Sequence, residues 1–485
     1  MTMPRSTPSD QGVDARGLLG LLDALETPPH STHSLMIARH GAVIAEGWWA
    51  PYARERVHLG YSLSKSFTAT TLGILAGQGV IDLDAPVLSY LVDLDAVDPV
   101  WRRVTVRHCI SMTAGHSAEA WDWRGDDVPA ATLPAVSIPA ATACVDSDPI
   151  LDAIVRTRVP DGEPGQVWAY NQVCTYLVAQ AIAAVTGQPL TSHVRRLLLD
   201  PLGGEGAKAQ RTPFGRDLGF SGLHVTTPTI VALAQTWLDA GRWQGEQLVP
   251  PPYVAAATVP TPASLRAEGM AGDWAHGYGF SFWGASHGYR GDGAFGQFAL
   301  VLPEQQVAVA ITSEVEDMQA TLDAVWTHLL PAVDAAVSSA ADRQLAARLG
   351  ELRHPPVRGG VDRTGEVRAV RNAQSQLPDA FGAVRLRTTE AGHQVLVIEH
   401  AEGELITAVG NGEWLDSTWA TRWGPQLSIA ASGAWHHGVF YAELRLVETP
   451  HTITVDLHPN HDVVLNWRLV PLTGSDPLNA VGFPV

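Results

Sequence analysis

The hydrophobic pattern of the chain begins with two short strands and a helix. Residues 34–49 carry two apolar runs on either side of a His-Gly pair, which is typical of a β-hairpin. Residues 60–79 then place apolar side chains at roughly helical spacing. Ser62 stands at the start of that stretch and Gly77 near its end, as helix start and stop signals do. We therefore predict a hairpin followed by a helix.

Later patterns extend this picture to a mixed domain. Residues 172–187 predict a second helix, and residues 295–314 predict two strands followed by an amphipathic helix. Residues 118–150 show no clean period and are rich in Ala, Pro and Asp, so an irregular excursion is expected there. Helices between an early hairpin and late strands indicate an α+β domain whose sheet joins both ends of the segment.

The pattern changes beyond about residue 335. A helical and then Pro/Gly-rich stretch at 336–365 predicts a linker between a domain at 1–335 and a second one at 366–485. The second domain contains about seven or eight short alternating runs separated by turn residues. This pattern favours an antiparallel β-domain, either a lipocalin-like barrel or a sandwich.

Charge and composition narrow the function classes. Acidic residues outnumber basic ones by 50 to 32, and no basic stripe is present, so nucleic acid is not an expected partner. No signal-peptide core and no run long enough to span a membrane occurs, and a cytoplasmic location without membrane association is expected. Three cysteines, Cys109, Cys144 and Cys174, are expected to be buried free thiols.

Lysine is nearly missing from the chain, which draws attention to the motif at residues 62–65. Only Lys65 and Lys208 occur, against thirty arginines. A desolvated Lys can lose its proton and act as a base, whereas Arg stays charged. Ser62 precedes Lys65 by three residues at a predicted helix start, so both side chains lie on one face. The helix N-terminus also offers unpaired N–H groups where an oxyanion forms.

The surroundings of this motif resemble the class C β-lactamase and penicillin-binding-protein superfamily. The segment YSLSKSFTA at 61–69 is similar to the nucleophile segment of that family, and 164–190 is similar to the segment that supplies its catalytic tyrosine. Segments 104–116, 222–251 and 288–314 also match in order and spacing. The resemblance covers roughly residues 10–332. It implies a β-lactamase/transpeptidase-like domain, an antiparallel sheet with helices on both faces and a helical subdomain.

The resemblance also implies roles for individual residues. Ser62 is the expected nucleophile, Lys65 its activating neighbour, and Tyr170 the group that shuttles protons between Ser62 and the leaving group. Whether Lys65 or Tyr170 takes the first proton is left open. The expected oxyanion hole consists of the backbone N–H groups of Ser62 and Ala294.

Two departures from the family pattern affect the expected substrate. The usual Tyr-x-Asn is Tyr170-Asn171-Gln172 here, and the usual Lys-Thr-Gly or His-x-Gly is Gly291-Asp292-Gly293. The cation that commonly holds a substrate carboxylate is therefore missing from that strand. We expect substrate contacts from the following residues: Asn171, Gln172, Arg290, Asp292 and Gly293, with His287 an alternative to Arg290.

The sequence therefore predicts a serine hydrolase that acts on a small ester, amide or short peptide through a Ser62 acyl-enzyme, without metal or cofactor. An amine acceptor in place of water would make it an acyltransferase or peptide cyclase, and a non-catalytic binding protein with the same fold is the rival from another class. The second domain has three alternative roles that the sequence does not distinguish: it caps the site, binds substrate or forms a homodimer. Four of its histidines are expected at the surface rather than on zinc: His436, His437, His458 and His461.

Overall fold

A computed structural model describes residues 3–117, 148–212, 214–361, 365–389, 393–421, 424–472, 474, 476–480 and 482–485. The chain forms two compact units. The first contains Met1–Gly47, Leu59–Glu351 and Gly482–Val485, and the second contains Trp48–His58 and Leu352–Val481. The irregular excursion expected at 118–150 lies almost wholly outside the described residues, and so does Cys144.

A six-stranded sheet, ordered β2-β1-β11-β10-β9-β8, is the centre of the first unit. The strands are β1 (Thr32–Arg39), β2 (Ala42–Trp48), β8 (Trp283–Gly284), β9 (Tyr289–Gly293), β10 (Gln297–Leu302) and β11 (Val307–Ser313). Strand β1 pairs with β11 antiparallel, with Leu35 opposite Ile311. The predicted sheet that joins both ends of the segment is therefore confirmed. All residues of β1, β10 and β11 are buried, as expected of strands that are covered on both faces.

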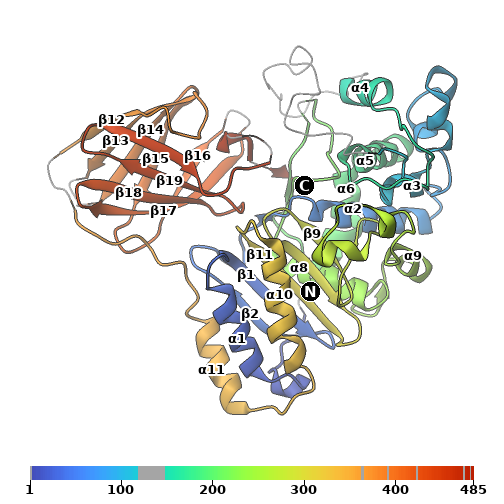
Figure 1. Cartoon of the computed structure of the whole chain (residues 1–485), viewed down its shortest axis with the longest axis horizontal. Coiled ribbons are helices and arrows are strands. Elements are labelled where there is room, and N and C mark those ends of the chain that lie inside the picture. The colour runs from blue at the N-terminus through green and yellow to red at the C-terminus, as the bar shows by residue number, and fades with distance from the viewer. Residues whose placement is uncertain are drawn as a thin grey trace. The chain divides into compact units, whose positions relative to one another are not determined.

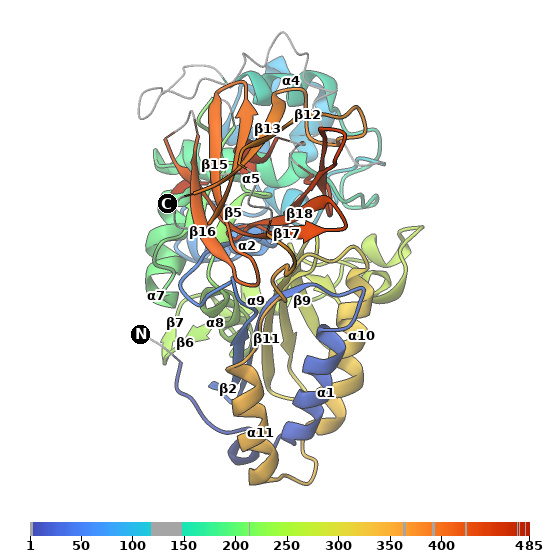
Figure 2. The ribbon, with the colours of Figure 1, turned by 90° about the vertical axis from the view of Figure 1, so that its left-hand side faces the viewer.

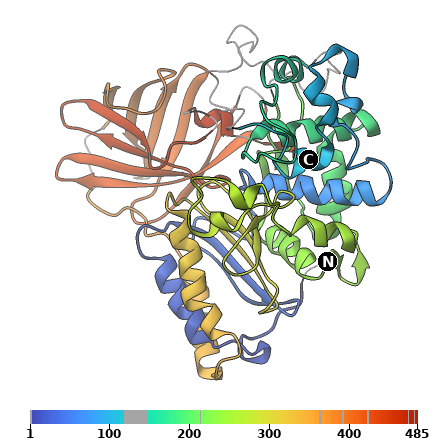
Figure 3. The same ribbon diagram turned by 45° about the vertical axis from the view of Figure 1, so that its right-hand side comes forward.

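Helices cover both faces of this sheet. On one face lie α1 (Ala15–Leu25), α10 (Met318–His328) and α11 (Ser339–Leu349), which run side by side (Figures 1 and 3). On the other face α8 (Thr227–Leu238) packs against β1, β10 and β11, as Figure 2 shows. Helix α1 buries its stripe of leucines, Leu18, Leu21, Leu22 and Leu25, at helical spacing.

Helix α2 (Leu63–Gly77), whose residues 63–75 are all buried, contacts α5, α6 and α9 among the remaining helices of this unit. These remaining helices are α3 (Val106–Ile110), α4 (Pro149–Thr157), α5 (Gln172–Thr186), α6 (Leu190–Val194), α7 (Asp200–Leu202) and α9 (Pro251–Ala257). A helix buried on every side must pair its polar side chains internally. Ser66 Oγ donates to the carbonyl of Ser281, and Thr68 Oγ1 donates to that of Gly219. The first helix predicted from sequence is thus the central helix of its unit.

Two small sheets complete the first unit. One has the order β21-β4-β5-β3, from β3 (His58–Leu59), β4 (Lys208–Ala209), β5 (Leu223–Val225) and β21 (Phe483–Pro484). The other pairs β6 (Arg242–Trp243) with β7 (Glu246–Gln247). Strand β21 comes from residues more than 250 positions beyond its neighbour β4, with Phe483 opposite Ala209.

The second unit is a nine-stranded sheet that curls into a nearly closed barrel (Figure 1), in the order β15-β14-β13-β12-β20-β19-β18-β17-β16. Its strands are β12 (Val367–Arg371), β13 (Phe381–Thr388), β14 (Gln394–His400), β15 (Gly403–Val409), β16 (Leu415–Ala420), β17 (Gln426–His436), β18 (Val439–Leu446), β19 (Thr452–Leu457) and β20 (Asp462–Trp467). The terminal strands meet where Ala408 N donates to Ser417 Oγ. Alternate residues face a shared apolar core that includes Phe440 and Trp467. The predicted all-β domain is confirmed.

The boundaries of the two units differ from the domain boundaries predicted from the sequence. Residues 48–58 belong to the second unit, where Ala50 N donates to Leu352 O and Arg56 forms an ion pair with Asp416. Helix α11, within the stretch expected as linker, belongs to the first unit. The hairpin and the following helix are adjacent in sequence, yet the residues between them fold with the β-domain.

Cys109 and Cys174 are buried free thiols, as the sequence suggested. Within the described part of the chain, no single helix has the length and apolar character to cross a bilayer, although the bent pair Gln172–Thr186 and Leu190–Leu202 passes on those two criteria.

Candidate active site

Ser62 is held at the start of α2 by a tight turn. Gly60 N donates to Leu223 O, and Leu63 N donates back to Gly60 O. Between them, Tyr61 adopts φ +46°, a left-handed conformation that is costly for a bulky residue and that occurs frequently next to catalytic groups. Ser62 caps the helix without a side-chain bond to the backbone, so its hydroxyl is not used for capping.

A second left-handed residue stands opposite the first. Phe295, directly after Ala294, has φ +66°, and its ring lies 5.3 Å from that of Tyr61. The two strained residues therefore flank Ser62 and Ala294, the two expected oxyanion donors. Neither residue was singled out from the sequence, because propensity gives no sign of positive φ in aromatic residues.

Lys65 is buried, with 1 % of its surface exposed, and three acceptors surround its nitrogen. Lys65 Nζ lies 3.1 Å from Ser62 Oγ, 2.7 Å from Gln172 Oε1 and 3.0 Å from the carbonyl of Phe220. The structure thus brings the expected nucleophile, the lysine and Gln172 together. Phe220 was missed in the sequence because a backbone acceptor carries no residue-type signal.

Tyr170 approaches the same lysine from a different part of the chain. Its ring centroid lies 4.7 Å from Lys65 Nζ. An aromatic cluster holds this ring in place: Trp283 stacks on it at 5.6 Å with an interplanar angle of 23°, and Tyr278 meets it edge-on at 5.9 Å. Such contacts restrict the orientation of the ring. Neither Trp283 nor Tyr278 was anticipated from the sequence.

Asn171 has a structural task instead of an open position in the site. Its Oδ1 accepts from Cys174 N and caps α5, while its Nδ2 donates to Ala169 O. Only 1 % of Asn171 is exposed. An amide with both ends used inside the protein is not available to a ligand, so its expected substrate contact gains no support.

Strand β9 presents glycines to α2. A Cβ atom on Gly291 would lie 2.5 Å from Ser66 Oγ, and one on Gly293 would lie 2.0 Å from Gly60 O. A side chain at position 293 would meet the backbone of the turn before Ser62, and one at position 291 would meet the side chains of Ser66 and Leu63. A lysine or histidine at position 291 therefore has no room unless these side chains of α2 move.

Arg290 does not replace that cation. Its guanidinium is fully buried, donates to Asp292 Oδ2 at 3.1 Å and to Gly284 O at 2.6 Å, and lies over the ring of Trp274. Burial lowers the pKa of Arg290 and raises the pKa of Asp292, with the ion pair opposing both shifts. The pair is enclosed within the protein. The alternative, His287, is exposed and packs against Trp326.

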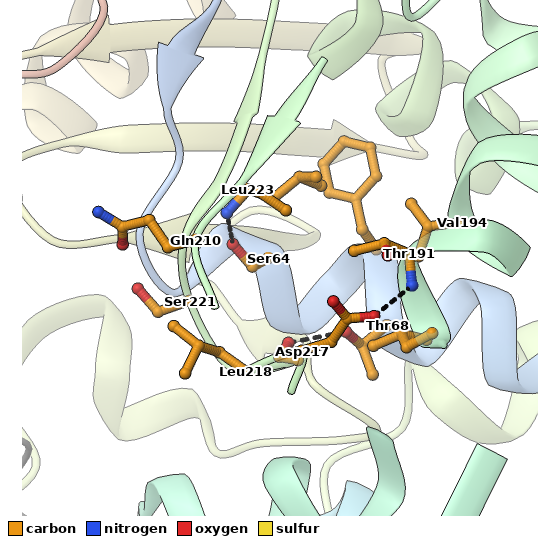
Figure 4. Close-up of a pocket in the computed structure, with 13 residues that line it drawn as sticks. Ser64, Thr68, Thr191, Val194, Gln210, Asp217, Leu218, Ser221 and Leu223 are labelled. Atoms are coloured by element: carbon orange, nitrogen blue, oxygen red, sulfur yellow. Dashed lines mark hydrogen bonds between the residues drawn. The ribbon is translucent and has the colours of Figure 1, made fainter. Parts of the chain in front are cut away.

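A small cavity lies beside α2, on the side of Ser64 and Thr68 (Figure 4). Its volume of about 20 Å³ suffices for one water molecule and excludes a substrate. Ser64 Oγ accepts from Leu223 N there, and Asp217 accepts from Thr191 N. The first bond ties α2 to β5, and the second ties α6 to the loop that contains Asp217. The cavity is therefore part of the support of the nucleophile helix.

Among the residues that the structure describes, no three His, Cys, Asp or Glu side chains gather closely enough to hold a metal ion. Three of the histidines considered from the sequence, His436, His437 and His461, are exposed, and His458 is half-buried.

Solved structures share this architecture. A protein from Bacillus anthracis described as a 6-aminohexanoate-dimer hydrolase matches with a TM-score of 0.53 and 19% identity, over 73% of this chain and 89% of its own. EstCE1, a hydrolase with promiscuous acyltransferase activity, matches with a TM-score of 0.51 and 18% identity, over 66% and 100%. A protein from Bacteroides dorei described as a beta-lactamase matches with a TM-score of 0.50 and 14% identity, over 65% and 99%.

At these identities the neighbours establish the fold alone. No curated protein sequence matches the chain. The family model for beta-lactamase, however, matches residues 22–331, which is more than half of the sequence and includes Ser62, Lys65 and Tyr170. The chain therefore belongs to the beta-lactamase family.

Proposed function

We propose that this protein is a serine hydrolase that cleaves a small ester or amide through an acyl-enzyme on Ser62. The observation that carries the proposal is the contact between Lys65 Nζ and Ser62 Oγ at a helix start, with the ring of Tyr170 beside the same nitrogen. Membership of a family of ester and amide hydrolases supports the same reaction class.

The proposed reaction has two steps. Ser62 Oγ bonds to the substrate carbonyl carbon and gives its proton to Lys65 or Tyr170. The backbone N–H groups of Ser62 and Ala294 stabilise the oxyanion. The bond to the leaving group then breaks as that group receives the proton, and the acyl group stays on Ser62. Water attacks the acyl carbon, loses a proton to the same base, and releases the acid with Ser62 restored.

We further propose that the substrate lacks a carboxylate beside the scissile bond. Position 291 has no room for a cationic side chain, and Arg290 is paired with Asp292 in the interior. A substrate carboxylate bound at this strand would therefore be desolvated without gaining an ion pair, which makes its binding free energy less favourable. Neutral esters and amides avoid this cost.

Hydrolysis of a short-chain p-nitrophenyl ester by the purified protein tests the first proposal. We expect turnover that disappears in Ser62→Ala and persists in Ser89→Ala, a matched control with an exposed serine. A fluorophosphonate should add its mass to the peptide that contains Ser62. Equal turnover in wild type and Ser62→Ala would reject Ser62 as nucleophile, and a lack of both turnover and labelling would favour the non-catalytic alternative.

Paired substrates test the second proposal. A neutral ester and the same ester with a carboxylate next to the scissile bond should differ in kcat/KM by at least about tenfold in favour of the neutral one, as one unpaired charge implies. Addition of a primary amine shows in the same assay whether the acyl group passes to an amine as well as to water.

A further inference from the structure

One end of the barrel-like sheet in the second unit contains a pocket of about 500 Å³. This volume is in the range of small-molecule sites in proteins. The pocket lies within residues 360–461 and involves the ends of β12, β17 and β19 with the two turns beside them. It is lined by Gly360, Val361, Val367, Trp435, Gly438, Leu457, His458, Pro459 and His461.

The alternation of the strands places this pocket at the mouth of the barrel. Ala369 and Val455 face the apolar core, so Val367 and Leu457, two positions along the same strands, face inward as well. Trp435 lies four positions beyond Ala431 on β17 and therefore faces the same side, and its ring lies 5.6 Å from that of Phe440. Deeper in the barrel the core side chains fill the interior. The pocket therefore has an apolar floor and opens at the barrel end.

Trp435, one of the lining residues, also carries a hydrogen-bond donor that the protein does not use. Its Nε1 is buried, and among the residues that the structure describes it has no hydrogen-bond partner. A buried N–H without an acceptor is costly, and the great majority of such groups are satisfied in folded proteins. The indole N–H can only donate, so a partner must supply an acceptor atom. Among the described residues, the lining contains no carboxylate that could take this position.

We propose that the barrel mouth binds a small amphiphile. Its flat apolar body lies against Val367, Leu457 and the ring of Trp435. The indole turns its N–H toward the mouth, and a carbonyl or carboxylate oxygen of the ligand accepts the hydrogen bond from Trp435 Nε1. The imidazole rings of His458 and His461 line the rim on the side of the β19–β20 turn. Every lining residue belongs to the second unit, whereas Ser62 belongs to the first.

Calorimetric titration with naphthalene-1-acetamide tests the site, with the full-length Ser62→Ala protein as host so that hydrolysis cannot contribute. Val367→Trp should fill the mouth and weaken binding by more than about tenfold. Val370→Trp is the matched control, since Val370 lies on the same strand, is 57% exposed and faces outward. We expect it to bind as the host does. Unbound probe in the host, or equal affinity in both tryptophan variants, would overturn the proposal.

A second comparison isolates the donor. Trp435→Phe keeps an aromatic ring but removes the N–H group. It should weaken naphthalene-1-acetamide and naphthalene-1-acetate by about three- to tenfold, the usual worth of one hydrogen bond, and leave 1-ethylnaphthalene unchanged because that probe has no acceptor. Equal loss for all three probes would overturn the assignment of Trp435 as donor. Thermal melting of each variant, matched to the host, separates these results from loss of folding.

Discussion

The amide oxygen of Gln172 lies 2.7 Å from the side-chain nitrogen of Lys65. Gln172 is the first residue of α5 and Lys65 belongs to the first turn of α2, so this bond connects the two helices at the site. Although Gln172 replaces the Asn of the Tyr-x-Asn pattern, its side-chain amide still accepts a hydrogen bond from Lys65. The longer side chain of Gln changes the reach, and the buried lysine receives its third acceptor from the backbone of Phe220.

We predict that Gln172 positions Lys65 rather than binding substrate. Gln172→Met has similar length and no amide acceptor, and it should lower kcat by about 10- to 100-fold, the worth of a hydrogen bond to a charged group. KM should stay within about threefold. Gln172→Asn should restore part of kcat if the shorter amide still reaches. Steady-state kinetics of the three proteins checks this, and a rise in KM at constant kcat would instead mark Gln172 as a substrate contact.

Lys65 should be irreplaceable by the other long cation. Its nitrogen is enclosed by three acceptors with 1 % of the residue exposed, and proton transfer requires a group that can lose its proton. We expect both Lys65→Met and Lys65→Arg to lower kcat/KM by about 10² to 10⁴, since Arg stays protonated. Retention of more than a tenth of the activity in Lys65→Arg would show that the lysine supplies charge alone.

Glycine at position 293 should be required by the close approach of β9 to the turn before Ser62. A Cβ there would lie 2.0 Å from Gly60 O and 3.0 Å from Leu63 N. Gly293→Ala should therefore destabilise the protein by about 1 to 3 kcal/mol and lower kcat, because backbone must shift. Gly350→Ala is the control, as its nearest neighbour would be at 3.5 Å. Thermal unfolding and ester turnover measure both effects, and equal behaviour of the two variants would contradict the argument.

Stability at low pH should depend on Asp273. Burial raises the pKa of its carboxyl, but hydrogen bonds from Gln319, Trp326 and Ser286 outweigh burial and hold the pKa at about 2. The unfolded carboxyl has a pKa of about 4. The stabilisation is thus complete above about pH 4 and is lost as pH falls through about 2.

Asp273→Asn provides the comparison for that dependence. It should remove part of the slope of unfolding free energy against pH between about 4 and 2, as measured by urea unfolding at a series of pH values. Asp23→Asn, a change on the exposed side of α1, is the control and should leave the slope unaltered. A wild-type slope in Asp273→Asn would show that other carboxyls cause the acid sensitivity.

Local patterns in the sequence predicted the secondary-structure elements and the positions of the candidate catalytic residues along the chain. The Ser62 and Lys65 spacing, the helix signals around them, and the alternating runs beyond residue 366 arise from neighbours a few positions apart, where periodicity and capping act. These local patterns predicted the α+β domain and the all-β domain, and the order of the elements along the chain predicted the sheet that joins the ends of the first domain; all are present in the structure.

The tertiary structure decided the contacts between distant segments. Phe220 O reaches Lys65 across 155 residues, and β21 joins the sheet of β4 and β5 from the far end of the chain. Arg290 looked available as a substrate cation, but the strand turns its guanidinium inward to Asp292 and Gly284 O. Such contacts depend on the space that packing leaves for each side chain and on the burial that makes polar groups pair. Neither the space nor the burial can be read from the linear sequence.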